Sequence, residues 1–400
     1  MKALLAAVSL IALTACSENE DSNKDFTADA NRIAQETLIV DTHIDVPYRL
    51  DAEWDDVSKA TKTGDFDYPR ALAGGLNAPF MSIYTPAQYD GTPRAKEHAE
   101  EMIGIVERVV AASPDKFRIA KTVADVEQAM KDGVIALPLG MENGSPVSGG
   151  LADVDYFFER GIRYITLAHS KSNSISDSSY DTERKWNGLS DYGKQVVKRM
   201  NELGIMVDIS HVSDEAFYDV LETAGVAPLA SHSSARHFTP GFERNMSDEM
   251  IKALAAKGGV IMINYGSAFL TADANVYNAG RDEAYLEYLA DEGMEDSTDL
   301  KDQFTEQYRA ENPYPYASLD DVLDHIDHVV EIAGVDAVGI GSDYDGVGDS
   351  LPTGLKDVAS YPNLVAGLLK RGYSEADIKK ILSGNLLRVW RAVEAYAASH

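Results

Sequence analysis

The sequence has 400 residues, of which 44% are hydrophobic and 25% are charged, a composition typical of a globular chain with a substantial core. Its formal net charge of −29 opposes binding to nucleic acid and to anionic lipid head groups. We therefore expect no nucleic-acid partner. The length exceeds that of most single-core domains, but an α/β barrel can use most of it as one domain.

The N-terminus predicts a signal peptide over residues 1–15. Lys2 precedes an uncharged apolar stretch that is too short to span a bilayer. The stretch ends in Leu-Thr-Ala-Cys, and this ending resembles the lipobox of bacterial lipoproteins, in which the cysteine, here Cys16, is lipidated. Ser17 after it resembles the signal for outer-membrane sorting. We expect a lipid-anchored protein of the bacterial cell envelope, on the outer membrane and facing the periplasm, with residues 16–30 as a flexible tether.

Eight short apolar runs alternate with helical patterns through the rest of the chain. They predict strands at 37–41, 78–84, 134–140, 162–168, 205–210, 227–231, 259–265 and 337–342. Stretches between them, such as DYGKQVVKRMNELG, have helical patterns, and several begin at Ser or Asp and stop at Gly. This alternation favours an α/β fold, a parallel (β/α)8 TIM-like barrel, over a doubly wound sheet.

We expect residues 31–400 to form a single domain on this barrel. The interval 270–316, rich in Tyr, Asp and Glu, is predicted to be an insertion between the seventh and eighth strands. Such an insertion would either cover a site or carry an oligomer contact, and the sequence does not decide between them. A homodimer is a candidate assembly.

Polar side chains follow six of the eight predicted strands, at the end of the barrel where active sites form. They are His43 and Asp45 after the first strand, Glu142 after the third, His169 after the fourth, His211 after the fifth, His232 after the sixth and Asp343 after the eighth. The other five histidines are predicted to lie at the surface: His98, His237, His325, His328 and His400.

These residue types indicate a metal site. His43 and Asp45 are two residues apart in an extended segment, so their side chains point the same way. Cys16 is the only cysteine, so ligands must be nitrogen and oxygen, which suit Zn²⁺, Mn²⁺ or similar ions. The set is too large for one tetrahedral ion that keeps a water, and it suits two ions about 3.5–4 Å apart with a bridging carboxylate.

Seven segments of the chain resemble the membrane dipeptidase (renal dipeptidase) family, zinc metallopeptidases of the amidohydrolase-like barrel group. The segments are VDTHID, GMENG, TLAHSKSN, NGLSDYGKQVVKRMNELGIMVDISHVSD, SHSSAR, RNMSDE and GIGSDYDGV, within a similarity that covers roughly residues 30 to 395. The resemblance implies a (β/α)8 barrel that carries two Zn²⁺ ions and hydrolyses dipeptides, including those with a C-terminal D-residue.

The resemblance also implies a division of the ligands. The first zinc ion would be held by His43 and Asp45 and the second by His211 and His232. Glu142 would bridge the two ions.

Catalytic and substrate-binding roles follow from the same resemblance. His169 would lie beside the scissile carbonyl and Asp343 would handle the proton. Arg244 in ERNMSDE matches the family arginine that faces the substrate carboxylate, but the preceding segment is offset by about one residue, so Arg236 is its competitor. The lipobox replaces the C-terminal lipid-anchor signal of the animal enzymes, and residues 386–400 lack the hydrophobic tail that such a signal needs.

Two other functions compete with a metallodipeptidase. An amidohydrolase-like metal hydrolase with the same barrel and metals could act on N-acyl amino acids, lactones or β-lactams. A non-catalytic metal- or ligand-binding lipoprotein would lack a ligand or a proton-handling residue, and the sequence contains all of them.

Overall fold

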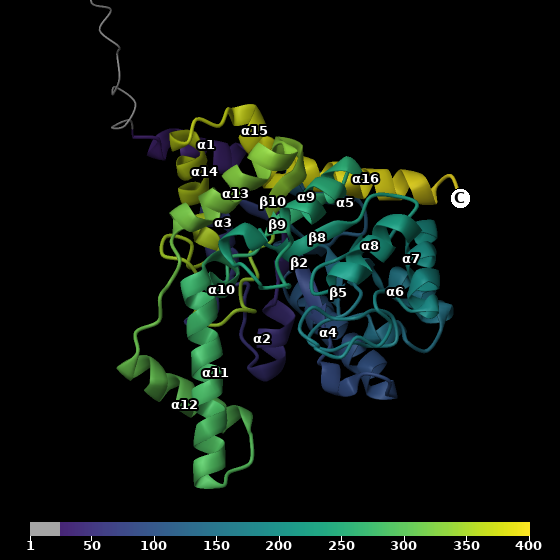
Figure 1. Ribbon diagram of the computed structural model, residues 1–400. Helices are drawn as coiled ribbons and strands as arrows, with labels where there is room; N and C mark the ends of the chain where they lie inside the picture. Colours follow the sequence, from purple (N-terminus) through teal and green to yellow (C-terminus); the bar gives the residue numbers. More distant parts are fainter. Residues whose placement is uncertain (1–24) are drawn as a thin grey trace, which may run out of the picture.

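A computed structural model describes residues 25–400, and eight parallel strands form its central barrel (Figure 1). The predicted signal peptide and Cys16 lie outside the described residues. The barrel strands, in order around the sheet, are β1 (Ile39–Ile44), β2 (Leu76–Tyr84), β5 (Leu139–Glu142), β6 (Ile162–Thr166), β7 (Met206–Asp208), β8 (Leu229–Ser233), β9 (Val260–Ile263) and β10 (Val338–Ile340).

The barrel closes through a short junction between its first and last strands. A single parallel bridge joins Ile44 to Tyr344, and the backbone N–H of Asp343 donates to the carbonyl of His43 across 3.0 Å. Each predicted apolar run overlaps a barrel strand, which confirms the (β/α)8 prediction. Only the third run is divided, because Pro138 separates β5 from β4 (Ile135–Leu137), which pairs with β3 (Phe117–Ile119) in a two-stranded sheet.

Helices surround the strands, and many begin at a serine or threonine cap. They are α1 (Thr27–Glu36), α2 (Val46–Ala52), α3 (Tyr68–Gly74), α4 (Pro93–Ala112), α5 (Val123–Asp132), α6 (Leu151–Arg160), α7 (Asp191–Leu203), α8 (Asp214–Thr223), α9 (Asp248–Ala256), α10 (Ser267–Leu270), α11 (Ala272–Glu292), α12 (Thr298–Glu311), α13 (Leu319–Ala333), α14 (Tyr361–Lys370), α15 (Glu375–Lys379) and α16 (Asn385–Ala397). Helix α7 follows the predicted pattern, because Ser190 accepts a bond from Gly193 N and Gly204 ends the helix with φ 92°. Helix α8 instead ends at Thr223, and its C-cap is Ala224 rather than Gly225.

Helix α16 packs against the end of the barrel that is opposite the C-terminal ends of the strands. Trp390 is fully buried there, and its ring lies 5.2 Å from that of Phe80 on β2. Because this end is filled by apolar side chains, only the other end is left for a polar site.

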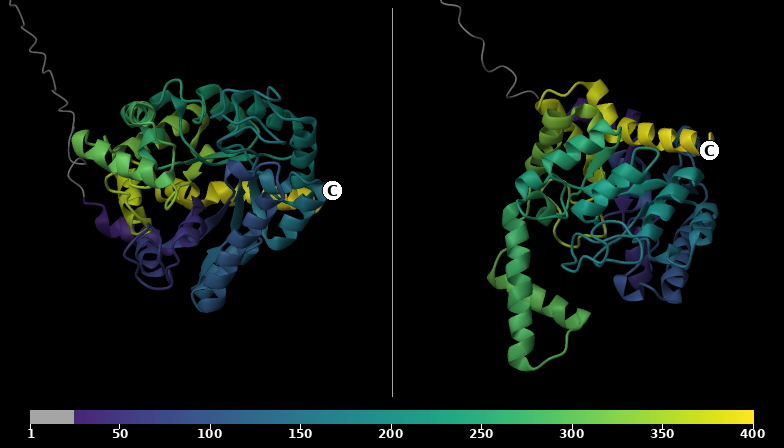
Figure 2. Two further views of the ribbon diagram at one scale, coloured as in Figure 1. Left: turned by 90° about the horizontal axis from the view of Figure 1, so that it is seen from below. Right: turned by 45° about the vertical axis from the view of Figure 1, so that its right-hand side comes forward.

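The interval 272–311 forms an arm that consists of α11 and α12. The arm extends from the barrel on the side away from α16 (Figures 1 and 2). Aromatic side chains pack its two helices together, among them Tyr277 of α11 and Tyr308 of α12, which make an edge contact at a centroid distance of 5.5 Å. Tyr277 also makes an edge contact with Tyr314, which follows α12, at 5.0 Å.

The structure corrects three details of the sequence analysis. The tether was expected to reach residue 30, but α1 begins at Thr27, and Ala30 is buried on the face that packs against the core. His98 and His325 are buried rather than at the surface. Each lies on the apolar face of its helix, four residues from Met102 and Val329 respectively, so helical spacing brings it to the core.

Among residues 25–400, no helix combines the length and apolar composition needed to cross a membrane.

Candidate active site

Seven residues predicted from the strand ends lie together at one end of the barrel. We call this set the rim cluster: His43, Asp45, Glu142, His169, His211, His232 and Asp343. The side chain of His169 is 20% exposed, and those of the other six are at most 12% exposed. The placement follows from topology, because the C-terminal ends of parallel barrel strands meet at one rim.

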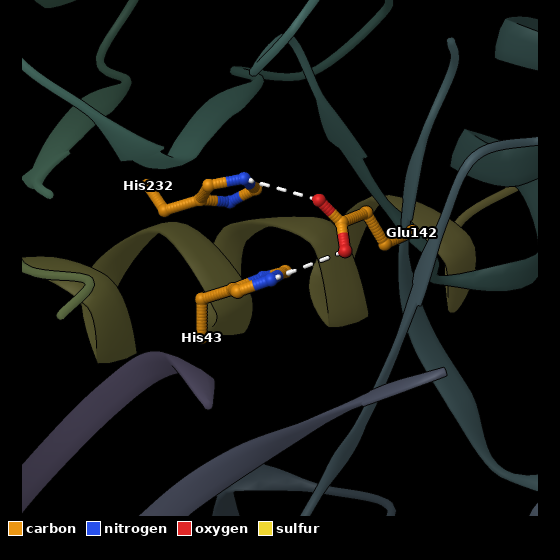
Figure 3. Close-up of side chains that lie close together, drawn as sticks. All are labelled: His43, Glu142 and His232. Atoms are coloured by element: carbon orange, nitrogen blue, oxygen red, sulfur yellow. Dashed lines mark ion pairs between the residues drawn. The ribbon is translucent and has the colours of Figure 1, made fainter. Parts of the chain in front are cut away.

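Glu142, the last residue of β5, occupies the centre of the rim cluster. Its Oε1 lies 3.1 Å from Nε2 of His211 and 3.4 Å from Nε2 of both His232 and His169. Its Oε2 lies 3.4 Å from Nε2 of His43 (Figure 3). One carboxylate therefore presents each oxygen to a different set of imidazoles, as a bridging ligand does.

Neighbouring side chains orient two of these imidazoles. Nδ1 of His232 is 2.7 Å from Oγ of Ser231, which donates to Asp208 across 2.6 Å. Nδ1 of His43 lies 2.8 Å from the hydroxyl of Tyr164. Each contact holds the far ring nitrogen and turns Nε2 toward Glu142, the arrangement that supports histidine ligands in metal sites.

The imidazole nitrogens of the rim cluster are positioned to bind a cation. Nε2 of His43 is buried without a hydrogen-bond partner, 3.4 Å from carboxylate oxygens of both Asp45 and Glu142. Nε2 of His211 and Nε2 of His232 are 2.8 Å apart. Two imidazole nitrogens that face each other beside a buried carboxylate are well satisfied when a metal ion shares their lone pairs.

Burial and neighbouring charges shift the pKa values of three rim histidines. Burial lowers the pKa of both His211 and His232 well below the usual value, and the Arg244 charge adds to the effect. These rings are therefore neutral, as metal ligation requires. Burial also opposes protonation of His43, but Tyr164, Glu142 and Asp45 outweigh it and raise its pKa. The carboxylates thus stabilise positive charge at the centre.

Two rim residues have unusual backbone conformations, and a nearby glycine lets the carboxylates of Asp45 and Asp343 lie close together. Asp343 and His211 adopt left-handed conformations, with φ of 65° and 69°, which few non-glycine residues adopt. Gly346 lies against both carboxylates, and a Cβ there would be 2.3 Å from Oδ2 of Asp45 and 2.4 Å from Oδ1 of Asp343. Only glycine leaves room for this approach.

Asp343 lies beside the proposed ligands, and Asn264 supports it. The side-chain amide of Asn264 donates to its Oδ2 across 2.7 Å. Burial raises the pKa of Asp343 to about 8, the Asp45 and Glu142 charges act in the same direction, and His43 opposes them. Asp345 points elsewhere, because its carboxylate pairs with Nε of Arg49 at 3.1 Å.

The structure distinguishes the two candidate arginines. Arg236 makes a bidentate ion pair with Asp214 at 2.6 and 2.7 Å and donates its Nε to a backbone carbonyl, so it is occupied structurally. Arg244 is buried against the rim, donates to Ser233 Oγ and to the carbonyl of His232, and has a buried Nε without a partner. Of the two arginines, Arg244 is therefore the one that has a hydrogen-bond donor without a protein partner near the site.

A cavity of about 740 Å³ opens over the rim cluster, within the range typical of small-molecule sites. Tyr48, Tyr84 and Tyr180 line it, and the sequence analysis missed all three. Tyr84 ends β2, and its ring lies 4.8 Å from that of His169. The strand-end pattern could have identified Tyr84 if aromatic residues had been considered along with charged ones.

Another His/Asp group lies away from this cavity, at the start of α9 and on α13. His328 Nε2 bonds to Asp248 across 2.8 Å, and the ring of His237 stacks on that of His328. This group shares no residue with the rim cluster.

Comparison with solved structures supports the fold. The chain is 27% identical to the probable dipeptidase PvdM from Pseudomonas aeruginosa, with a TM-score of 0.82 over 93% of this chain and 99% of that one. A metallo peptidase from Rhodobacter sphaeroides, liganded with a phosphinate mimic of the dipeptide L-Ala-D-Ala, is 24% identical, with a TM-score of 0.73 over 89% and 99%. An amidohydrolase from Pseudomonas aeruginosa is 21% identical, with a TM-score of 0.70 over 91% and 98%. The last two similarities bear on the fold alone.

The family comparison bears on function. The model of the membrane dipeptidase family, peptidase family M19, matches residues 27–400, which include the whole rim cluster. This match favours a dipeptidase over the other metal hydrolases considered from the sequence. The chain therefore belongs to the membrane dipeptidase family and is a metallodipeptidase.

Proposed function

We propose that the rim cluster holds two Zn²⁺ ions and hydrolyses the peptide bond of dipeptides. The observation that carries this proposal is the position of Glu142, whose two carboxylate oxygens face different imidazoles at 3.1 to 3.4 Å. His43 and Asp45 would hold one ion, and His211 and His232 the other. Bound zinc would lower the pKa of water toward neutrality and polarise a peptide carbonyl.

The proton-handling residue in this proposal is Asp343. It lies within 4.0 Å of His43, and Asn264 fixes one of its oxygens. Its ionised carboxylate takes a proton from the attacking water and returns it to the leaving amine, which is general acid–base catalysis. The neighbouring zinc charges would favour the ionised form and counteract the effect of burial on its pKa.

His169 and Arg244 would position the substrate. Burial lowers the pKa of His169, so its ring is neutral and its Nδ1, which lacks a partner, is free to donate toward the developing oxyanion or accept from the substrate. Arg244 would pair with the substrate α-carboxylate through its spare donors, because a guanidinium matches a carboxylate in geometry.

The direct test combines metal analysis with dipeptide hydrolysis. Protein purified without chelator should contain two zinc ions per chain and cleave Ala-Ala in the L,L or L,D form. Removal of the metal should abolish turnover, and added Zn²⁺ should restore it. Hydrolysis of N-acyl amino acids, lactones or β-lactams at higher kcat/KM than any dipeptide would contradict the proposal.

We also propose that the mature protein is a lipoprotein of the bacterial outer membrane, with residues 1–15 removed, a short tether after Cys16 and one catalytic barrel domain. The proposal is supported by the sequence around Cys16. Cys16→Ser should release the protein in soluble form with unchanged kcat. A substituted protein that still sediments with membranes after salt washing would contradict it. The homodimer stays a prediction.

A further inference from the structure

The arm formed by α11 and α12 lines the same cavity as the rim cluster. Five of its residues do so: Asn278, Arg281, Asp282, Lys301 and Arg309. The first three are spaced i, i+3 and i+4 on α11, so they share one helix face. The insertion therefore forms part of the wall of the active-site cavity.

Charge is segregated across the arm. Residues 272–311 contain twelve Asp and Glu but only three Lys and Arg, namely Arg281, Lys301 and Arg309. All three basic residues line the cavity, whereas Asp282 is the one acidic residue that does so among the arm side chains that the structure describes. We call Arg281, Lys301 and Arg309 the cationic wall.

Nearby carboxylates compensate the cationic wall only in part. Asp282 lies 2.9 Å from Arg281 and 3.5 Å from Lys301, and Asp349 lies 3.1 Å from Arg309. Two carboxylates thus face three cations. The cationic wall therefore carries one more charge than the carboxylates that pair with it, in a chain whose net charge is −29.

Packing holds parts of the cationic wall in place. The guanidinium of Arg309 lies 4.6 Å from the ring centroid of Tyr314, which also contacts Tyr277 of α11. The side chain of Arg281 is only 17% exposed, although it contributes to the cavity lining. Partial burial strengthens the interaction of such charges with a ligand relative to an exposed surface.

We propose that the cationic wall is an anion-binding subsite that selects dipeptides with an acidic side chain. This inference rests on the proposed dipeptidase function, in which the zinc ions and Arg244 would engage the peptide bond and the α-carboxylate. A carboxylate on the substrate side chain would then be the group that binds the cationic wall. Neutral dipeptides would still be cleaved, but less efficiently.

The competing role for these cations is to attach the arm through ion pairs. Lys301 joins α12 to α11 through Asp282, and Arg309 joins α12 to the segment after β10 through Asp349. Arg281 differs, because its partner Asp282 is the adjacent residue and the pair joins no two elements. A substitution of Arg281 therefore tests substrate specificity without breaking an ion pair between two structural elements.

The test compares glutamate with glutamine, which match in shape but not in charge. The panel is Ala-Glu, Ala-Gln, Glu-Ala, Gln-Ala and Ala-Ala, in L,L and L,D forms. We expect kcat/KM to be about tenfold higher for Glu than for Gln at one position, a preference that decreases as ionic strength rises. Arg281→Gln should reduce this Glu:Gln ratio about threefold to tenfold, a larger change than its effect on kcat/KM for Ala-Ala.

Two acidic residues of α11 provide matched controls. Asp282→Asn removes a carboxylate from the cavity and should raise the Glu:Gln ratio. Glu283→Gln makes the same charge change at the next, exposed residue outside the cavity lining and should leave the ratio unchanged.

A Glu:Gln ratio near one at both positions, with Ala-Ala cleaved normally, would overturn the subsite and leave the dipeptidase proposal standing. An unchanged ratio in Arg281→Gln would also overturn it. Failure to cleave any dipeptide would contradict both proposals.

Discussion

Asn264 and Asp343 are joined by a hydrogen bond of 2.7 Å from the asparagine amide to Oδ2, while Oδ1 of Asp343 lies 4.0 Å from Nε2 of His43. One oxygen is thus fixed by the protein and the other is turned toward the metal centre. A carboxylate held in this way is suited to proton transfer at the cavity, because it need not reorient between accepting and donating.

Asp343→Ala should leave both metal ions bound and lower kcat about 10²- to 10⁴-fold, the usual contribution of a general acid–base group. The change in KM should be smaller. Steady-state kinetics together with metal analysis of the same preparation provide the measurement. Loss of metal along with activity would instead make Asp343 a ligand.

Asp345→Ala is the matched control for that experiment. The carboxylate of Asp345 pairs with Arg49 and accepts the backbone N–H of Asp65 across 2.6 Å, so it supports the loop after β10. Its loss should lower thermal stability and change kcat less than Asp343→Ala does. Equal losses of kcat in the two variants, with metal retained, would contradict the assignment to Asp343 alone.

Glu142→Gln should reduce metal content more than His211→Ala does. Glu142 approaches four imidazoles through its two oxygens, whereas each histidine would ligate one ion. An amide also lacks the negative charge that balances two dications. Elemental analysis per chain provides the measurement, with His328→Gln, which lies outside the rim cluster, as the control. Full occupancy in Glu142→Gln would rule out a bridging role.

Arg244→Gln and Arg236→Gln should have different effects. Arg244→Gln should raise KM for dipeptides about tenfold to hundredfold, since a charge-assisted hydrogen bond contributes about 1.5–3 kcal/mol. Arg236→Gln should instead lower stability, because it leaves Asp214 without its bidentate partner. Kinetics and thermal denaturation of both variants separate the two effects. A larger rise in KM for Arg236→Gln would reverse the assignment.

The barrel and its rim were predictable from local sequence because both depend on short-range patterns. Each strand overlaps a buried apolar run, and polar residues that follow such runs reach one end of the barrel by topology alone. The division of the third run at Pro138 was not predictable, because whether the chain interrupts pairing there depends on the neighbouring β3.

The arm shows more clearly which features local sequence patterns do not predict. Its helices can be expected from the residue pattern, but the contacts of Tyr277 with Tyr308 and Tyr314, which are remote in the chain, cannot. Strand-end positions likewise identify His43 and Glu142, but not Tyr164, which contacts His43. Nor do they identify Asp208, which accepts a hydrogen bond from Ser231 beside His232.

His325 should make stability depend on pH. Its ring is fully buried on α13, where Nδ1 accepts the backbone N–H of Ala235 at 3.0 Å and Nε2 contacts the carbonyl of Leu270 at 2.9 Å. Burial lowers its pKa to about 4, from an ordinary value near 6.5. The unfolded chain therefore binds the proton first as pH falls, so this contribution is complete above about pH 6.5 and is lost toward pH 4.

The measurement is the free energy of unfolding of the wild type and of His325→Gln, which stays neutral, at pH 7.5 and pH 5. Because a pKa unit corresponds to about 1.4 kcal/mol, the wild type should lose about 2 kcal/mol more than the variant between these values. Other titrating groups are common to both proteins and cancel in the comparison. His400→Gln, at the exposed C-terminus, should behave as the wild type does. Equal pH dependence in the wild type and His325→Gln would show that His325 is not held neutral by the fold.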